Sequence, residues 1–139
     1  MWHQKSLVIE TEGRGLYEIS HLVSQSVVGT GVKTGVCHLF IRHTSASLII
    51  SENADPVVLD DLEAYFNRLV PDGDSLYRHT LEGADDMPAH VRSVMTQTSL
   101  TLPVVDGRLG LGVWQGVYLW EHRFNPHRRT CVATIEGES

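Results

Sequence analysis

The chain of 139 residues has only two cysteines and no apolar run long enough to cross a bilayer. Residues 1–6 lack the apolar core and the cleavage site of a secretory signal. Without such a signal, Cys37 and Cys131, each within a strand-like apolar segment, are predicted to be buried reduced thiols rather than a disulfide. We therefore expect a cytoplasmic protein that does not bind a membrane.

Basic residues are also scarce, with 11 Lys and Arg against 17 Asp and Glu and a formal net charge of −6 at pH 7. A nucleic-acid-binding domain usually presents a basic face, so nucleic acid is not an expected partner. Linkers, repeats and low-complexity segments are missing as well, and a chain of this length forms one core. Residues 1–139 are predicted to be a single domain.

Hydrophobic periodicity predicts a mixture of strands and helices. Alternation over residues 36–43 predicts a strand that carries His43 at the end of an inward-facing row. Asp55 and Pro56 form a cap and first-turn signal for a helix through Leu69. Shorter helices are predicted from Ser20 and from Asp86. Other strands are predicted over residues 4–10, 16–19, 48–51, 99–105, 108–113, 117–124 and 130–136.

Two details of this assignment concern packing. The helix that starts at Asp86 is predicted to bury Val91, Val94 and Met95. The last two strands are predicted to pair with each other across the turn at residues 125–127. The expected fold class is α+β, a mostly antiparallel sheet or sandwich with two or three helices packed on it.

Histidine is the residue type that stands out, with eight copies. His43, His79 and His90 lie close in sequence to carboxylates or hydroxyls, and Asp86 is among those carboxylates. Neutral imidazole and carboxylate oxygen are ligands that suit divalent first-row metals such as zinc. No two of these histidines have the i, i+4 spacing of a helical metal motif. The spacing therefore leaves open that they are hydrogen-bonded structural residues.

An isolated acid, Glu121, lies in the same strand row as Val117 and Leu119. A carboxylate in an apolar row is usually paired or functional. Either it transfers protons in a reaction, or it forms an ion pair with Arg123 or Arg129.

Hydroxyls follow His43 directly, at Thr44 and Ser45. No nucleophile-elbow pattern surrounds these residues, so a serine hydrolase is disfavoured, and the hydroxyls are predicted to hold a phosphate instead. Trp114 and Gln115 follow a glycine-rich segment and are predicted to line a pocket.

Five motifs in this order resemble the YjbQ family, also called uncharacterised protein family 0047. The likeness spans residues 4–137. The motifs are His43-Thr44-Ser45-Ala46-Ser47-Leu48 with Glu52-Asn53-Ala54-Asp55-Pro56, Tyr77-Arg78-His79, Asp85-Asp86-Met87-Pro88-Ala89-His90, Gly112-Val113-Trp114-Gln115-Gly116 and Glu121-His122-Arg123.

The resemblance implies a compact α+β domain that assembles as a homotrimer. It also implies an enzyme with thiamine-phosphate synthase activity, which joins a pyrimidine pyrophosphate to a thiazole phosphate. The alternatives are a metal-dependent hydrolase or other phosphate-handling enzyme, and a trimer that binds a metal or ligand without catalysis.

Site roles follow from the same resemblance. A divalent metal, zinc or else magnesium, would be held by His43, His79 and His90. The candidate catalytic residues are Glu121, Asp86 and Gln115. The residues expected to bind the small phosphorylated substrate are Thr44, Ser45, Arg78, Trp114 and Arg123.

Overall fold

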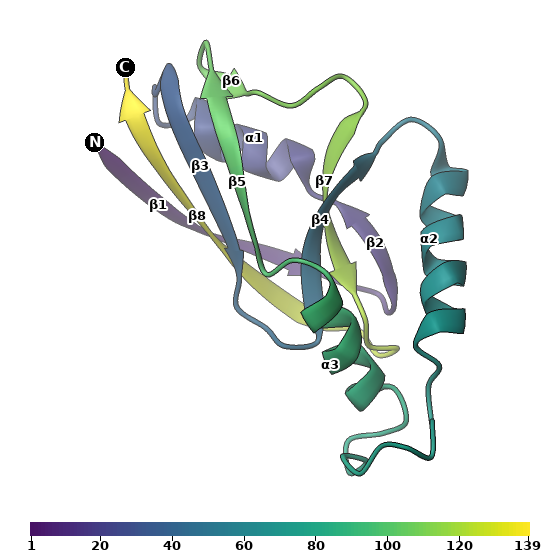
Figure 1. The fold of residues 1–139 in the computed structure, drawn as a ribbon. Helices are drawn as coiled ribbons and strands as arrows, with labels where there is room; N and C mark the ends of the chain where they lie inside the picture. Colours follow the sequence, from purple (N-terminus) through teal and green to yellow (C-terminus); the bar gives the residue numbers. More distant parts are fainter.

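The computed structural model describes residues 1–139 and contains three helices and eight strands (Figure 1). None of the three helices has the length and apolar character needed to cross a membrane. In chain order the elements are β1 (Trp2–Glu10), β2 (Gly15–Glu18), α1 (Ser20–Val28), β3 (Thr34–Ile41), β4 (Ala46–Glu52), α2 (Pro56–Leu69), α3 (Asp86–Met95), β5 (Ser99–Val105), β6 (Arg108–Leu109), β7 (Gln115–Glu121) and β8 (Arg128–Glu138).

The strands form two antiparallel sheets. A five-stranded sheet has the order β1-β8-β3-β5-β6, and a three-stranded sheet has the order β2-β7-β4. The inward rows of both sheets and one face of α1 share a single core, as the burial of Cys37, Leu39 and Leu119 shows. This arrangement confirms the predicted α+β class with its antiparallel sheets.

Helix α2 begins where the sequence predicts. The Asp55 carboxylate accepts a hydrogen bond from the Val57 amide at 3.0 Å, and Pro56 occupies the first helical position. The predicted apolar stripe is only half-buried: α2 stands beside the three-stranded sheet (Figure 1) and packs against Trp120 of its central strand β7. Its main aromatic contact is Phe66 on Trp120, with ring centroids 4.7 Å apart.

Helix α3 buries a different face from the one predicted. Val94 is 83% exposed and Met95 49% exposed, while Ala89 and Arg92 are fully buried. The physical reason is polar: Arg92 donates to Glu63 of α2 at 2.9 Å, an ion pair that turns this face of α3 inward. Apolar periodicity alone could not show that an arginine occupies the core side.

The return strand predicted for residues 108–113 is much shorter. Asp106 and Gly107 form the expected tight turn, with φ of 51° and 81°. Pairing then ends after two residues, since the next partner on β5 is Pro103, which has no amide hydrogen to continue the ladder. The Gly110 amide donates to the Pro103 carbonyl at 2.8 Å and the chain turns away.

The last two strands do not pair with each other, contrary to the prediction. Strand β7 has β2 on one side and β4 on the other, so neither of its edges is free for β8. Strand β8 instead fills the position between β1 and β3 in the other sheet. The turn at residues 125–127 therefore carries the chain from one sheet to the other.

The burial of Arg92 leads to a stability prediction. Arg92→Ala leaves Glu63 without its ion-pair partner and is expected to lower the free energy of unfolding by about 3 kcal/mol. Val94→Ala, on the exposed face of the same helix, is the matched control and should change it by less than about 0.5 kcal/mol. Urea denaturation of both variants checks this; a larger loss in Val94→Ala would contradict the observed orientation of α3.

Candidate metal centre at the start of helix α3

Three side chains with metal-ligating atoms converge near the start of α3. They are His79, Asp86 and His90, and their ligand atoms all lie within 4.8 Å of one another. His79 comes from the loop between α2 and α3, and the other two residues lie one turn apart on the helix. The i, i+4 spacing of Asp86 and His90 is a sequence signal that a comparison among histidines alone misses.

Asp86 is the buried member of this group, with 3% of its side chain exposed. Its Oδ2 lies 2.7 Å from His79 Nε2 and 3.3 Å from His90 Nε2, and its Oδ1 accepts from Arg123 at 2.8 Å. Burial alone would raise the pKa of Asp86, but the hydrogen bond from His79 and the charge of Arg123 outweigh burial and lower it. The carboxylate is therefore ionised at neutral pH.

The ring orientation of His90 is fixed by its surroundings. Its Nδ1 lies 3.1 Å from the carbonyl oxygen of Thr44. A carbonyl can only accept, so Nδ1 carries a hydrogen, and Nε2 is the ring nitrogen that points to Asp86. Thr44, expected to bind substrate through its hydroxyl, instead positions a candidate ligand through its backbone.

His79 is the exposed member of the group, with 51% of its side chain accessible. Its ring centroid lies 5.4 Å from that of His90, at an interplanar angle of 61°. The neighbouring Arg78 is also exposed and forms no ion pair. The centre is thus open on the side of His79 and closed on the side of Asp86.

Arg123 has a different role from the phosphate ligand that was predicted. Its Nε donates to Asp85 at 2.9 Å, and its two terminal nitrogens donate to Asp86 at 2.8 Å and to the Glu82 carbonyl at 2.9 Å. These bonds use all three guanidinium nitrogens. Arg123 therefore holds the loop end and Asp86 in place.

His43 lies outside the group, so the predicted set of three histidines is corrected. Strand β3 ends at Ile41, and His43 turns toward β8, where its Nε2 accepts from the Thr130 amide at 2.8 Å. Its Nδ1 lies 3.4 Å from Arg129. Burial, followed by the charge of Arg129, lowers the pKa of His43 and keeps the ring neutral.

Of the two roles predicted for Glu121, the structure shows the ion pair, and the partner is Arg129. It is fully buried and accepts from Arg129 through both carboxylate oxygens and from Thr11 at 2.8 Å. Burial would raise the pKa of Glu121, but the hydrogen bonds from Arg129 and Thr11 outweigh burial and lower it. A carboxylate held ionised this way is a poor proton-transfer group. Ser45 accepts from Arg129 at 2.9 Å and belongs to the same structural network.

Trp114 and Gln115 are not brought to the metal-ligand group. Gln115 begins β7 and Glu121 ends it, so about 20 Å of extended strand separates them. The Gln115 side chain accepts from the Gly112 amide at 2.8 Å, and Trp114 is 64% exposed. Within one chain, neither residue lines the candidate centre.

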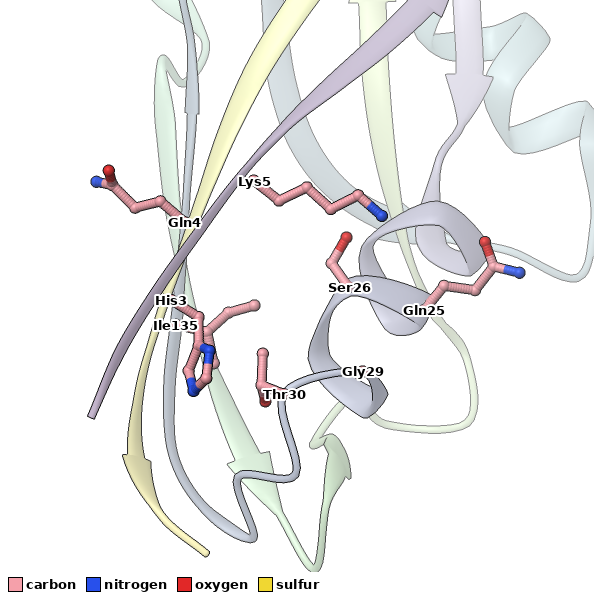
Figure 2. A pocket seen from close by; sticks show the side chains of 8 residues that line it. All are labelled: His3, Gln4, Lys5, Gln25, Ser26, Gly29, Thr30 and Ile135. Atoms are coloured by element: carbon pink, nitrogen blue, oxygen red, sulfur yellow. The ribbon is translucent and has the colours of Figure 1, made fainter.

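A polar cavity of about 270 Å³ lies elsewhere, between β1 and α1 (Figure 2). The hydroxyls of Ser26 and Thr30 in its wall donate to helix carbonyls. None of His79, Asp86 and His90 lines it. The residues with catalytic or metal-binding chemistry therefore gather at α3 and not at this cavity.

The fold and the site define a class: a two-sheet α+β protein with a histidine–aspartate cluster between a loop and a helix start. The family model of UPF0047 YjbQ-like proteins matches residues 5–138. The chain belongs to this family, which confirms the resemblance seen in the sequence motifs.

Individual relatives agree with this assignment. The UPF0047 protein sll1880 of Synechocystis sp. is 56% identical over 136 residues, which cover 98% of this chain and 92% of that protein. The UPF0047 protein YjbQ of Escherichia coli O157:H7 is 45% identical over 99% of this chain and 100% of its own.

Solved structures of similar proteins share the fold. The hypothetical protein APE1520 of Aeropyrum pernix K1 matches with a TM-score of 0.89 and 27% identity over 98% of this chain and 99% of its own. An uncharacterized conserved protein of the YjbQ/UPF0047 family from Clostridium acetobutylicum matches with a TM-score of 0.87 and 30% identity, covering 95% and 99%.

The buried side chain of His122 makes the folding stability depend on pH. His122 follows β7, is fully buried, and lies 2.9 Å from the Ser47 hydroxyl through Nε2, while its Nδ1 has no partner. Burial, followed by the charge of Arg92, lowers the pKa of His122 from 6.5 to about 3. Between these values the unfolded chain binds a proton that the folded chain does not.

Folding stability is therefore expected to fall as the pH drops below 6.5, and by pH 4 this histidine accounts for about 3 kcal/mol of the loss. The variant His122→Gln should lose stability less steeply over this range. Urea unfolding at pH 7, 5.5 and 4 measures the difference, with the exposed His38→Gln as control. Equal slopes for wild type and His122→Gln would contradict the assignment.

Proposed function

We propose that this protein is an enzyme that uses a divalent metal, held by His79, Asp86 and His90, to act on a small phosphorylated molecule. The observation that carries the proposal is the convergence of three ligand atoms within 4.8 Å at a centre that is open on one side. Three protein ligands with an open position are typical of catalytic zinc sites.

The donor set supports zinc over magnesium. Two imidazole nitrogens and one carboxylate oxygen suit zinc, whereas magnesium prefers oxygen ligands in octahedral geometry. The partners behind the ligands support the same conclusion, because the Thr44 carbonyl orients His90 and Arg123 orients Asp86. Such outer partners commonly fix metal ligands in place.

A divalent ion here would supply positive charge to the phosphate oxygens of a substrate. The chain contributes the remaining parts. Asp86 stays ionised, with Oδ1 held by Arg123 and Oδ2 facing the two histidines, so in this proposal it acts as a metal ligand and not as the predicted catalytic residue. Arg78, exposed beside His79, is the free cation nearest in sequence that can receive a phosphate.

The family resemblance supplies the specific reaction for this proposal, thiamine-phosphate synthesis. The site supports its phosphate-handling part, and the chain has no aspartate-rich magnesium motif for the pyrophosphate. A zinc-dependent phosphate hydrolase is the second candidate, since the donor set favours zinc. The two are separated by supplying the pyrimidine pyrophosphate with and without the thiazole phosphate: a synthase releases pyrophosphate only when both are present, whereas a hydrolase does not need the second substrate.

We further propose that the protein is a homotrimer. Apolar side chains on the outer face of the five-stranded sheet support self-association, since Val36, Phe40 and Val105 are 44%, 45% and 53% exposed. Sedimentation equilibrium measures the assembly directly, and a species of 15.5 kDa would remove this part of the proposal.

The metal centre makes a prediction that separates it from a three-histidine site. Calorimetric titration with zinc should show one ion per chain, and His90→Ala should weaken binding by more than 100-fold. Arg123→Gln, which frees one oxygen of Asp86, should weaken it by about 10-fold to 100-fold. His43→Asn should change zinc affinity by less than about 3-fold.

Circular dichroism of each variant controls for folding. A large loss of zinc affinity in His43→Asn, or none in His90→Ala, would contradict the His79–Asp86–His90 centre. The exposed His38→Ala serves as the matched histidine control.

A further inference from the structure

The segment between Gly73 and Ala84 forms a closed loop that carries His79. The Gly73 amide donates to the Ala84 carbonyl at 3.0 Å and closes its base. Gly73 and Gly83 adopt φ of 69° and 110°, which lets the chain leave and rejoin the body sharply. In Figure 1 this loop extends past the start of α3 and away from both sheets.

Few bonds join the loop to the rest of the protein. Inside it the hydrogen bonds are local, such as Tyr77 amide to Asp74 carbonyl at 3.1 Å. Two side-chain bonds reach outside: Arg123 to the Glu82 carbonyl at 2.9 Å, and His79 Nε2 to Asp86 at 2.7 Å. A candidate metal ligand is therefore also one of the two attachments of the loop.

A cavity of about 320 Å³ lies between this loop and α3, and His79 is part of its wall. This volume falls at the lower end of the range for small-molecule pockets. The other lining residues come from the loop and from the first turn of the helix: Gly73, Asp74, Ser75, Tyr77, Thr80, Gly83, Ala84 and Met87.

The chemistry of the lining points to one kind of ligand group. No lysine or arginine lines the cavity, and Asp74 is its one carboxylate, so a phosphate is not favoured inside it. The Tyr77 ring and the Met87 thioether offer contacts that aromatic rings prefer. Glycines at both ends of the loop leave flat walls without side chains.

We propose that this cavity binds a flat, uncharged aromatic ring of the substrate, and that His79 fastens the loop that forms the outer wall of the cavity. The inference rests on the proposed metal centre and specifies the substrate class for it: a phosphorylated aromatic molecule. Its phosphate lies at the metal ligands, and its ring lies between Tyr77 and Met87.

Two phosphonates that differ only in the ring provide the test. Phenylphosphonate and methylphosphonate carry the same anionic head and cannot be hydrolysed to phosphate. On zinc-loaded protein, phenylphosphonate is expected to bind about 10-fold tighter than methylphosphonate. Calorimetry or competition with a chromophoric zinc chelator gives both dissociation constants.

Variants of the cavity wall test whether the phenyl ring of phenylphosphonate binds there. Tyr77→Ser, and separately Met87→Gln on α3, should reduce the ratio of the two affinities to less than 3 and leave methylphosphonate binding unchanged. Tyr77→Phe should retain the ratio. Tyr65→Ser, an exposed tyrosine on α2, is the matched control and should also retain it.

Amide hydrogen exchange of loop residues 75–82 measures how firmly His79 holds the loop against α3. Zinc should slow exchange in this segment, and His79→Ala should abolish the slowing while circular dichroism stays unchanged.

The outcomes separate this inference from the proposed function. If zinc binds but the two phosphonates bind equally, or the ratio survives both wall variants, the cavity is not the ring site and the inference is overturned while the metal centre stands. If zinc binds without slowing exchange in the loop, the fastening role of His79 is overturned. If zinc does not bind at all, both proposals fall.

Discussion

The buried ion pair between Glu121 and Arg129 is the interaction on which the arrangement of the two sheets depends. Glu121 ends β7 in the three-stranded sheet, and Arg129 lies in β8 of the five-stranded sheet. Thr11, between β1 and β2, and Ser45, between β3 and β4, bond to the same pair. Three of the places where the chain passes between the sheets therefore meet at one pair of opposite charges. Removing either charge would leave the other buried and unpaired, which is the costly case for such pairs.

The candidate centre is built outward from this junction. The Arg123 amide donates to Glu121 at 3.2 Å, and its side chain then reaches Asp86. The carbonyl of Thr44, one residue before Ser45, accepts a hydrogen bond from His90 Nδ1. The outer partners of both helical ligands thus come from strand ends fixed by the ion pair. This is why a site made from a loop and a helix start can have defined geometry, and why His79, which has no such support, is the exposed member.

The sequence predicts features of the fold that depend on neighbouring residues. It does not predict features that depend on pairing between residues far apart in the chain. Asp55 and Pro56 predict the start of α2 because a cap and a first-turn proline act within one turn. The predicted inward face of α3 is wrong because Arg92 pairs with Glu63 of α2, and no local periodicity shows that pairing. The predicted pairing of the last two strands is wrong because β7 already has β2 and β4 as neighbours.

Prediction of the site shows the same division. Family motifs drew attention to His79 and His90, and the helical spacing of Asp86 and His90 was readable in the sequence. The positions of His43 and Arg123 were not readable, since each depends on partners contributed by other segments. For Glu121, only the fold decides between the two alternatives that the sequence leaves.

The proposed metal centre at His79, Asp86 and His90 is tested most directly by a crystal structure of the zinc-loaded protein with anomalous scattering at the zinc edge. One strong anomalous peak per chain is expected, within about 2.0–2.2 Å of His90 Nε2, a His79 nitrogen and an Asp86 oxygen. A peak bonded to His43, or no peak among His79, Asp86 and His90 at full zinc loading, would contradict it.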